Sequence, residues 1–246
     1  MMPSHALTIA GRIFNQVVRD RRTFALIMIV PIVVMTLIWL SFPKEMGMLD
    51  YIAPALLATL AIFFGFLLTG ISFLRERSQG TLERLMASPV SRSDIVLGYL
   101  FGFFIFALAQ TAIILFYTIY VLDVHYTGDL WQIFVFQILV LICAINLGIF
   151  ISTFARNEFQ MVQFIPLIIL PQVFLCGVLW PVEQMSTALQ WVAKFLPLTY
   201  AVDGLREIML QGKSLIEVGF DLGILVAFAV GISLITAFTL KRSAGS

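Results

Sequence analysis

Apolar residues along this 246-residue chain gather in six long runs separated by shorter polar segments. A helix needs roughly 20 apolar residues to cross the hydrocarbon core of a bilayer. The pattern therefore predicts an all-α polytopic membrane protein with six transmembrane helices, organised as one membrane domain over residues 1–246. None of the runs contains Asp, Glu, Lys, Arg or His. The predicted spans are residues 23–42, 52–74, 98–122, 131–154, 161–180 and 222–240.

Two segments outside the spans also carry helical patterns. Residues 5–19 place an apolar face along one side, which is typical of a helix lying in the membrane interface or of an ordinary cytoplasmic lead-in. Residues 181–219 are too apolar for a free loop and predict two short helices separated at Pro197, forming a re-entrant helical hairpin on the outer side. The face of the first segment consists of Leu7, Ala10, Phe14 and Val17. The two stripes of the hairpin are Met185, Ala188, Leu189, Val192 and Phe195, and then Val202, Leu205, Ile208 and Met209.

The fifth span contains Pro166 and Pro171, and Gly177 lies near its outer end. Each proline removes a helix hydrogen bond, which predicts a kinked helix. Kinked membrane helices can line a pathway, but proline also occurs in membrane helices for packing reasons alone.

Composition agrees with the membrane assignment. Hydrophobic residues make up 61% of the chain, charged residues only 12%, and the mean hydropathy is +1.01. A soluble fold could not bury this much apolar surface. Cys143 and Cys176 lie inside apolar runs, so we expect them to behave as small apolar residues and not as a disulfide.

Positive charge is distributed unequally between the two sides that six spans define. Eleven of the 15 Lys and Arg residues fall in the N-terminal tail, the C-terminus and the loops after the second and fourth spans. Cytoplasmic loops carry an excess of Lys and Arg. The distribution predicts a multi-pass protein of the cell (inner or plasma) membrane with both termini cytoplasmic.

The spans contain no machinery for driving transport by protons or sodium ions. Such transport usually needs ionisable groups at membrane depth. The strongest polar groups in or beside the spans are amides, which more often form interhelical hydrogen bonds than contact a substrate. They are Gln110, Gln137, Asn146, Gln160, Gln163 and Gln172.

The chain also lacks the signs of an enzyme. Gly212-Lys213-Ser214 resembles the end of a phosphate-binding loop, but Glu207 stands where that motif needs its first glycine, and no strand precedes it. The two histidines, His5 and His125, both lie outside the spans. We therefore predict no catalytic residue, no metal ligand and no cofactor bound by this chain.

The loop after the second span, residues 75–97, is the most charged part of the chain. Gly80 permits a break, residues 81–87 can form a short amphipathic helix, and Ser88-Pro89 stops it because the residue before proline avoids the helical region. Ser91 with Asp94 predicts a capping box that starts the next helix. A short helix fixed between two spans is suited to receiving force from a cytoplasmic partner.

This loop resembles the coupling region of the ABC-2 type permeases. The elements are E-x-x-x-G-T-L-E-x-L at residues 76–85 and S-P-V-S-R at residues 88–92, and a second family motif matches LPLTYAVDGLRE at residues 196–207. The loop is most similar to the drug-resistance branch, and the basic, aromatic N-terminal motif of polysaccharide exporters is not found. The resemblance extends over essentially the whole chain.

The resemblance implies a permease that is not an enzyme by itself. We expect it to pair with a second permease copy, as a homodimer, and with two copies of a cytoplasmic ABC ATPase that binds ATP and Mg, and not with nucleic acid. It also implies which residues couple this chain to the ATPase: Arg75, Glu76, Gly80, Thr81, Leu82, Glu83, Leu85, Ser88, Pro89, Ser91 and Arg92.

The expected function is outward movement of an amphiphilic or hydrophobic substrate, such as a drug, an antibiotic or a lipid-like compound. Phe63, Phe66, Gln163 and Phe174 are candidates for the substrate pathway, although membrane Phe more often packs against lipid. Three alternatives stay open: a polysaccharide or glycolipid exporter of the same family, an autonomous secondary transporter or channel, and a non-transporting protein that recruits an ATPase.

Overall fold

A computed structural model describes residues 3–19, 21–42, 48–80, 92–178 and 180–243. Within these ranges the chain is helical and contains no strand, which confirms the all-α prediction. The long helices are α1 (Pro3–Arg19), α2 (Arg21–Ser41), α3 (Met48–Ser78), α5 (Arg92–Tyr120), α6 (Leu130–Ser152), α7 (Glu158–Leu175) and α10 (Gly219–Ser243). Between α7 and α10 lie the short 3₁₀ helix η2 (Val182–Gln184), α8 (Thr187–Ala193) and α9 (Pro197–Gln211).

Five of the described helices are long and apolar enough to cross a membrane. They are α3, α5, α6, α7 and α10, and each coincides with one of the predicted spans. The remaining predicted span, residues 23–42, coincides with α2, whose apolar stretch Ala25–Ser41 is shorter. The chain is therefore a polytopic membrane protein, and the count of six crossings stays a prediction.

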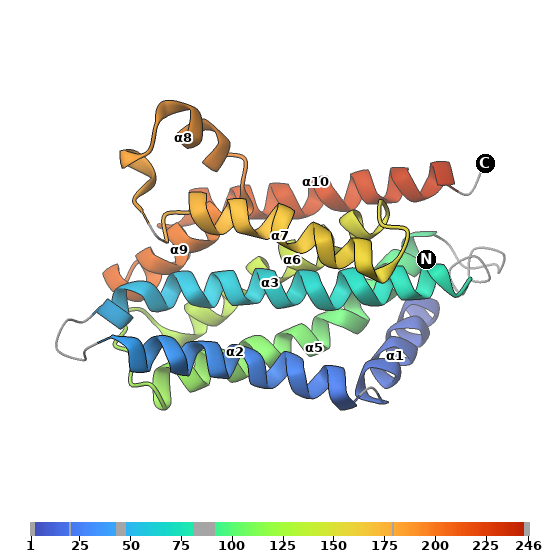
Figure 1. The fold of residues 1–246 in the computed structure, drawn as a ribbon, viewed down its shortest axis with the longest axis horizontal. Helices are drawn as coiled ribbons and strands as arrows, with labels where there is room; N and C mark the ends of the chain where they lie inside the picture. Colours follow the sequence, from blue (N-terminus) through green and yellow to red (C-terminus); the bar gives the residue numbers. More distant parts are fainter. Residues whose placement is uncertain (1–2, 20, 43–47, 81–91, 179, 244–246) are drawn as a thin grey trace.

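The long helices α2, α3, α5, α6, α7 and α10 run side by side, and α1 lies across one end of this bundle at a steep angle (Figure 1). The last turns of α3 and α10 reach the same end as α1, whereas α8 and α9 lie at the other end (Figure 1). The two ends of the described chain thus share one side of the bundle, as an even number of crossings requires.

Close packing of α3 against α6 forms the centre of the bundle. A Cβ atom on Gly148 of α6 would overlap the Thr69 hydroxyl and lie 2.7 Å from the Phe66 carbonyl oxygen. Similarly, a Cβ atom on Gly65 of α3 would lie only 2.8 Å from the Cβ atom of Ala144 on α6. Small residues at these positions let two helix backbones approach closely, which is how helices associate in a membrane.

Two of the amides in the spans make interhelical hydrogen bonds, as the sequence indicated. Gln137 of α6 donates to the Leu57 carbonyl of α3 at 2.8 Å. Asn146 of α6 accepts from the Ser233 hydroxyl of α10 at 2.7 Å. By contrast, Gln172 donates to the Ile168 carbonyl within its own helix.

Helix α1 packs on the bundle along one side, and of the predicted interfacial face only Ala10 is among its buried described side chains. Its buried apolar side chains are Ile9, Ala10 and Ile13, while Leu7 and Phe14 remain exposed. Whether α1 lies in the membrane interface stays a prediction.

Helix α7 continues through both prolines without a break and ends at Leu175. Gly177 then takes a positive φ of 80°, a conformation that favours glycine, and turns the chain away from the bundle. The buried stripe of α7 consists only of Met161, Ile165, Ile169 and Gln172.

Two short helices flank Pro197, as predicted for the outer hairpin. The α9 stripe is buried completely, because Val202, Leu205, Ile208 and Met209 pack into the bundle. The α8 stripe faces outward instead, with Leu189, Val192 and Phe195 exposed. Gly212, in the sequence that resembles a phosphate-binding loop, adopts a left-handed φ of 69° and caps the C-terminus of α9.

Candidate functional site

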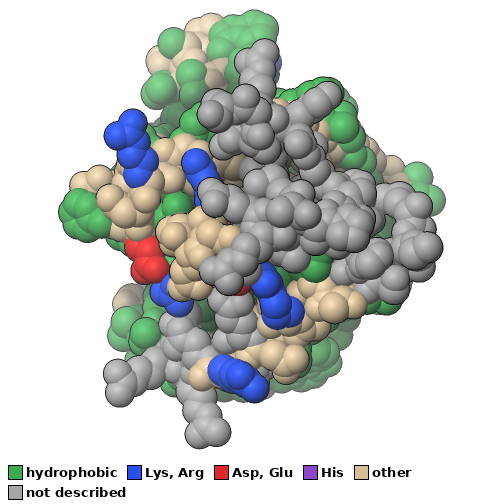
Figure 2. Space-filling model, turned by 90° about the vertical axis from the view of Figure 1, so that its right-hand side faces the viewer, with side chains coloured by type: hydrophobic (Ala, Val, Ile, Leu, Met, Phe, Trp, Pro, Cys, Tyr) green, Lys and Arg blue, Asp and Glu red, His purple; other side chains and the backbone are tan. Residues whose placement is uncertain are grey.

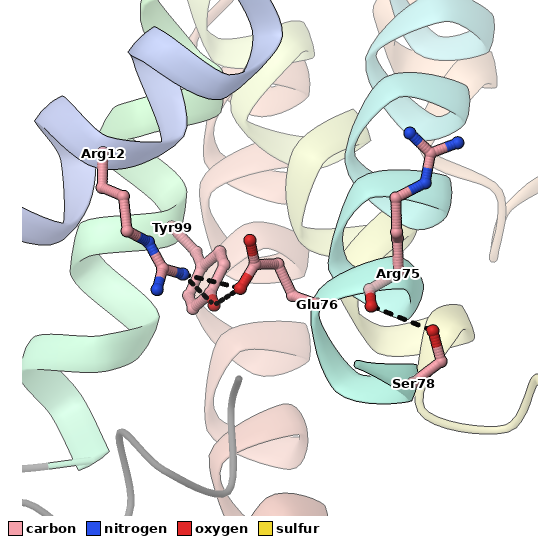
Figure 3. Close-up of polar contacts among 5 residues, drawn as sticks. All are labelled: Arg12, Arg75, Glu76, Ser78 and Tyr99. Carbon is pink, nitrogen blue, oxygen red and sulfur yellow. Dashed lines mark hydrogen bonds and ion pairs between the residues drawn. The ribbon is translucent and has the colours of Figure 1, made fainter. Parts of the chain in front are cut away.

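Three consecutive residues in the last turn of α3 contact three different parts of the bundle. Arg75, Glu76 and Arg77 point in different directions because successive side chains on a helix are separated by about 100°. Figure 3 shows the Arg75 and Glu76 side chains leaving α3 on different sides. This turn lies immediately before the predicted coupling helix, so its contacts define how that segment joins the membrane helices.

Glu76 is the centre of a cluster that joins α3 to α1 and α5. Its carboxylate accepts a 2.6 Å hydrogen bond from the Arg12 guanidinium and a 3.1 Å hydrogen bond from the Tyr99 hydroxyl. Arg12 also donates to the Tyr99 hydroxyl at 3.3 Å, which closes the triangle seen in Figure 3. Glu76 is 4% exposed and Tyr99 is 0% exposed. The charge of Glu76 is therefore held inside the protein and balanced by Arg12.

Aromatic packing surrounds this cluster. The ring of Tyr99 lies 5.0 Å from the ring of Phe73 in an edge-to-face arrangement and 6.1 Å from that of Phe103. Aromatic rings favour such tilted arrangements. The packing fixes the Tyr99 ring, and with it the direction in which its hydroxyl points.

Helix α1 is held against α5 at Gly102. A Cβ atom at Gly102 would lie 2.8 Å from the Cβ atom of Ile13 and 3.2 Å from the Ala10 carbonyl oxygen. On the next turn, the ring of Phe14 stacks on that of Phe106 at 4.9 Å. This close approach brings the guanidinium of Arg12 within reach of α3.

The two arginines beside Glu76 contact the other side of the bundle. Arg75 forms a 2.9 Å ion pair with Glu158, which lies in the first turn of α7. Arg77 donates a 2.7 Å hydrogen bond to the Thr153 carbonyl at the C-terminal end of α6. The last turn of α3 is therefore bonded to α1, α5, α6 and α7.

Gly80 ends this turn as predicted, with a positive φ of 68°. The remaining predicted coupling residues lie outside the described part of the chain, except Arg92, at which α5 begins. That starting point agrees with the predicted helix start after Ser91. The coupling residues outside the described ranges are Thr81, Leu82, Glu83, Leu85, Ser88, Pro89 and Ser91.

The end of the molecule that carries this site is basic. Figure 2 views this end and shows Lys and Arg side chains around its described part. Arg19 and Arg156 are exposed, and the Arg12 and Arg75 side chains are 39% and 40% exposed. Basic residues gather on the cytoplasmic side of membrane proteins, and the orientation of this end stays a prediction.

Two cavities follow α3 between α2 and α7. The first has a volume of about 420 Å³, apolar walls from α2 and α3, and a charged end formed by Arg75, Glu76 and Glu158. The second, of about 480 Å³, is lined mainly by apolar side chains of α2, α3 and α7. Both include Phe63 in their walls. Together they form an amphipathic surface that is apolar along most of its length and charged at one end.

The four predicted pathway residues do not converge. Phe63 lines both cavities, but Phe66 is buried within the core. Gln163 and Phe174 lie on the exposed surface of α7, with Phe174 58% exposed.

The opposite end of the bundle carries an acidic cavity of about 510 Å³ next to the second family motif. Burial and the carboxylate of Asp221 raise the pKa of Asp203 to about 6, against the opposing effect of Arg206. Arg206 donates to the Gly177 carbonyl at 2.9 Å and lies 4.5 Å from the ring centroid of Tyr51. Within the described residues, no group of His, Cys, Asp and Glu could hold a metal ion.

Sequence reasoning missed Arg12, Tyr99 and Glu158 as members of the site. Arg12 and Glu76 are 64 residues apart, and Arg75 and Glu158 are 83 residues apart. No local pattern connects residues at such separations. A usable signal was present, however, because Glu76 lies directly beyond an apolar span and needs a positive partner if it is buried.

Comparison with known proteins identifies the family to which the chain belongs. It is 25% identical over 193 residues to the probable multidrug ABC transporter permease YbhS of Escherichia coli, which covers 78% of this chain and 51% of the relative. It is 30% identical over 158 residues to the linearmycin resistance permease protein LnrN of Bacillus subtilis, covering 64% of this chain and 41% of the relative. It is also 30% identical over 174 residues to Nodulation protein J of Rhizobium meliloti, covering 70% of this chain and 64% of the relative.

The chain thus spans less than two thirds of the length of each of these three proteins. The family model for the ABC-2 type transporter matches residues 5–210, which include the coupling region and nearly all of α1 and α9. This match shows that the chain belongs to the ABC-2 type transporter family.

Proposed function

We propose that this chain is the membrane permease of an ABC exporter. In the proposed complex, two copies of a separate cytoplasmic ATPase bind ATP and Mg, and a second copy of the permease completes the membrane part. The observation that carries the proposal is the last turn of α3, where Arg75, Glu76 and Arg77 connect the start of the coupling region to α1, α5, α6 and α7. A force applied at residues 81–91 would reach several membrane helices through this turn.

The proposed substrate is amphiphilic or hydrophobic. The cavities along α3 support this class, because their walls are apolar and one end carries Arg75, Glu76 and Glu158. Such a surface suits a molecule with an apolar body and a polar or charged head. Two relatives are named for multidrug transport and for linearmycin resistance, which favours drugs or antibiotics over other amphiphiles.

The proposed location is the inner or plasma membrane, with both termini in the cytoplasm. The basic end that carries α1 and the end of α3 supports this orientation (Figure 2). A reporter fused to the C-terminus that is active only in the cytoplasm tests it. Activity of a periplasmic reporter at that position would contradict it.

Export of a polysaccharide or glycolipid is a second candidate. One relative is named for nodulation and not for drug resistance. The amphipathic cavity would also accept the lipid part of a glycolipid. A transport assay that compares a cationic drug with a lipid-linked sugar separates the two candidates.

The decisive experiment changes the coupling segment in the assembled complex. The permease is co-purified with an ABC ATPase from the same organism and reconstituted into vesicles, and uptake of the fluorescent amphiphile rhodamine 6G is measured together with ATP hydrolysis. We expect Glu83→Ala or Leu85→Ala to leave membrane insertion intact. The amount of rhodamine 6G transported for each ATP hydrolysed should fall to the background level. Lys194→Gln, at the opposite end of the bundle, is the matched control and should behave as the wild type.

Two outcomes would overturn the proposal. Transport by the permease without any ATPase would indicate a secondary transporter or channel. Binding of an ATPase whose loss changes no export would indicate a recruiting protein that does not transport.

A further inference from the structure

The cluster of Arg12, Glu76 and Tyr99 joins three helices close to the point where the coupling region begins. Glu76 lies only four residues before Gly80, at which the coupling region leaves α3. Its carboxylate is bonded to α1 through Arg12 and to α5 through Tyr99, with one oxygen, Oε2, accepting from both. The cluster thus joins the last turn of α3 to a helix that precedes all the predicted spans.

Burial makes this contact difficult to replace. The side chain of Glu76 is 6% exposed with α1 in place, and Arg12 is the positive partner that balances its charge there. A buried carboxylate that loses its positive partner is strongly unfavourable. The exposed pair of Arg75 and Glu158 differs, because water reaches both of its side chains, which are 40% and 53% exposed.

Helix α1 is bonded through Arg12 to Glu76 of α3 and to Tyr99 of α5. Its apolar contacts, at Ile13 and Phe14, are with α5 at Gly102 and Phe106. Arg12 therefore links α1 directly to the turn that carries the coupling region, so a displacement of α1 can be passed to that turn.

We propose that Arg12 is a positioning residue that makes α1 and the last turn of α3 move as one unit during the transport cycle. Tyr99 fixes the direction of the Glu76 carboxylate and keeps it available to Arg12. The inference rests on the proposed function, because the cycle it describes is driven by the ATPase. It assigns α1 a mechanical role in addition to any contact with that partner.

A distance measurement in the full-length permease tests the proposal. Spin labels are attached at Asn15→Cys on α1 and Gln79→Cys after α3, both of which are exposed positions, in a background without Cys143 and Cys176. The distance distribution is recorded in nanodiscs for the permease alone and for the complex with the ATPase and a non-hydrolysable ATP analogue. We expect a single narrow peak that keeps its position in both states.

The Arg12→Gln variant should lose that single peak and should show a separation that changes when the ATP analogue binds. Arg12→Lys keeps a positive donor and should restore the narrow peak. Tyr99→Phe removes one hydroxyl and should broaden the peak without abolishing it. Lys194→Gln is the control and should match the wild type.

An unchanged narrow peak in Arg12→Gln in both states would overturn the inference. If Arg12→Gln does not fold, the same conclusion follows from an unchanged peak in Tyr99→Phe. The proposed function would fail by a different result, namely that no ATPase binds the wild-type permease. In that case the distances measured in the permease alone still show whether Arg12 joins the two helices.

Discussion

Ser233 on α10 donates a 2.7 Å hydrogen bond to the Asn146 amide oxygen on α6. Few side chains of α10 are buried, so this bond is a principal polar contact that positions the helix. Interhelical hydrogen bonds in membranes contribute about 0.6–2 kcal/mol. We therefore expect Ser233→Ala to lower the free energy of unfolding by about 1 kcal/mol, measured by denaturant titration in mixed micelles. Thr239→Val is the control, because the Thr239 hydroxyl bonds only to the Ile235 carbonyl of its own helix.

Gly148 should tolerate no side chain. A Cβ atom there would meet the Thr69 hydroxyl and the Phe66 backbone carbonyl, and backbone atoms cannot move aside easily. Overpacking of a core costs about 1–3 kcal/mol, so Gly148→Ala should be clearly less stable in the same assay. At Gly231 of α10 a Cβ atom would meet nothing within 4 Å. Gly231→Ala should be neutral or stabilising, and equal behaviour of the two variants would contradict the α3–α6 packing.

Phe63 should contribute to the binding of amphiphiles, since its ring forms part of both cavities. Removing one buried aromatic contact costs about 1.5 kcal/mol, which is a tenfold loss of affinity. We expect this weakening of rhodamine 6G binding in Phe63→Ala, measured by fluorescence anisotropy with the permease in nanodiscs. Phe101→Ala changes a 52% exposed Phe on α5 and should leave the dissociation constant unchanged. Equal affinities in all three proteins would exclude these cavities as the binding site.

Asp203 should make the end of the bundle that carries α9 less stable as pH rises. Its pKa is about 6 in the folded protein, above the value of 3.8 for a free side chain, so folding favours the protonated form. This contribution is present below about pH 4 and is lost as pH rises through about 6. The side chain keeps contact with solvent, which reduces the effect.

The measurement compares melting temperatures of the wild type and Asp203→Asn from pH 4 to pH 7. We expect the stability difference to grow in favour of Asp203→Asn across this range. Asp129→Asn, at an exposed position near the same end, controls for the removal of a negative charge. A constant difference over the whole range would show that Asp203 has an ordinary pKa.

The apolar runs predicted six spans, and five of them coincide with long apolar helices at approximately the predicted bounds, because hydrophobicity and helix length are local properties. Gly80 and Gly212 were also predictable as chain breaks, and both adopt a positive φ. The outward-facing stripe of α8 was not predictable in the same way. Leu189 and Phe195 have the same apolar character whether they face protein, lipid or a partner.

The contacts that build the candidate site were beyond local reasoning. Arg75 and Glu76 were predicted as coupling residues from their position in the coupling region, but the motif does not show that their side chains contact different helices. Their partners Glu158 and Arg12 come from α7 and α1, and only the packing of those helices on α3 and α5 brings them together. Charge pairs over long sequence separations depend on tertiary structure, which the spacing of residues does not encode.

The directions in which the side chains at the end of α3 point limit where residues can be inserted into or deleted from the chain. One residue inserted ahead of Arg75 would turn the last residues by about 100°, and Arg75 would then face Arg12 in place of Glu76. One residue deleted ahead of Arg75 would bring Arg77 to the same position. Either change sets two arginines against each other in a buried site. Homologues can therefore exchange side chains along this helix, but we expect insertions and deletions to be excluded from it and confined to the loops.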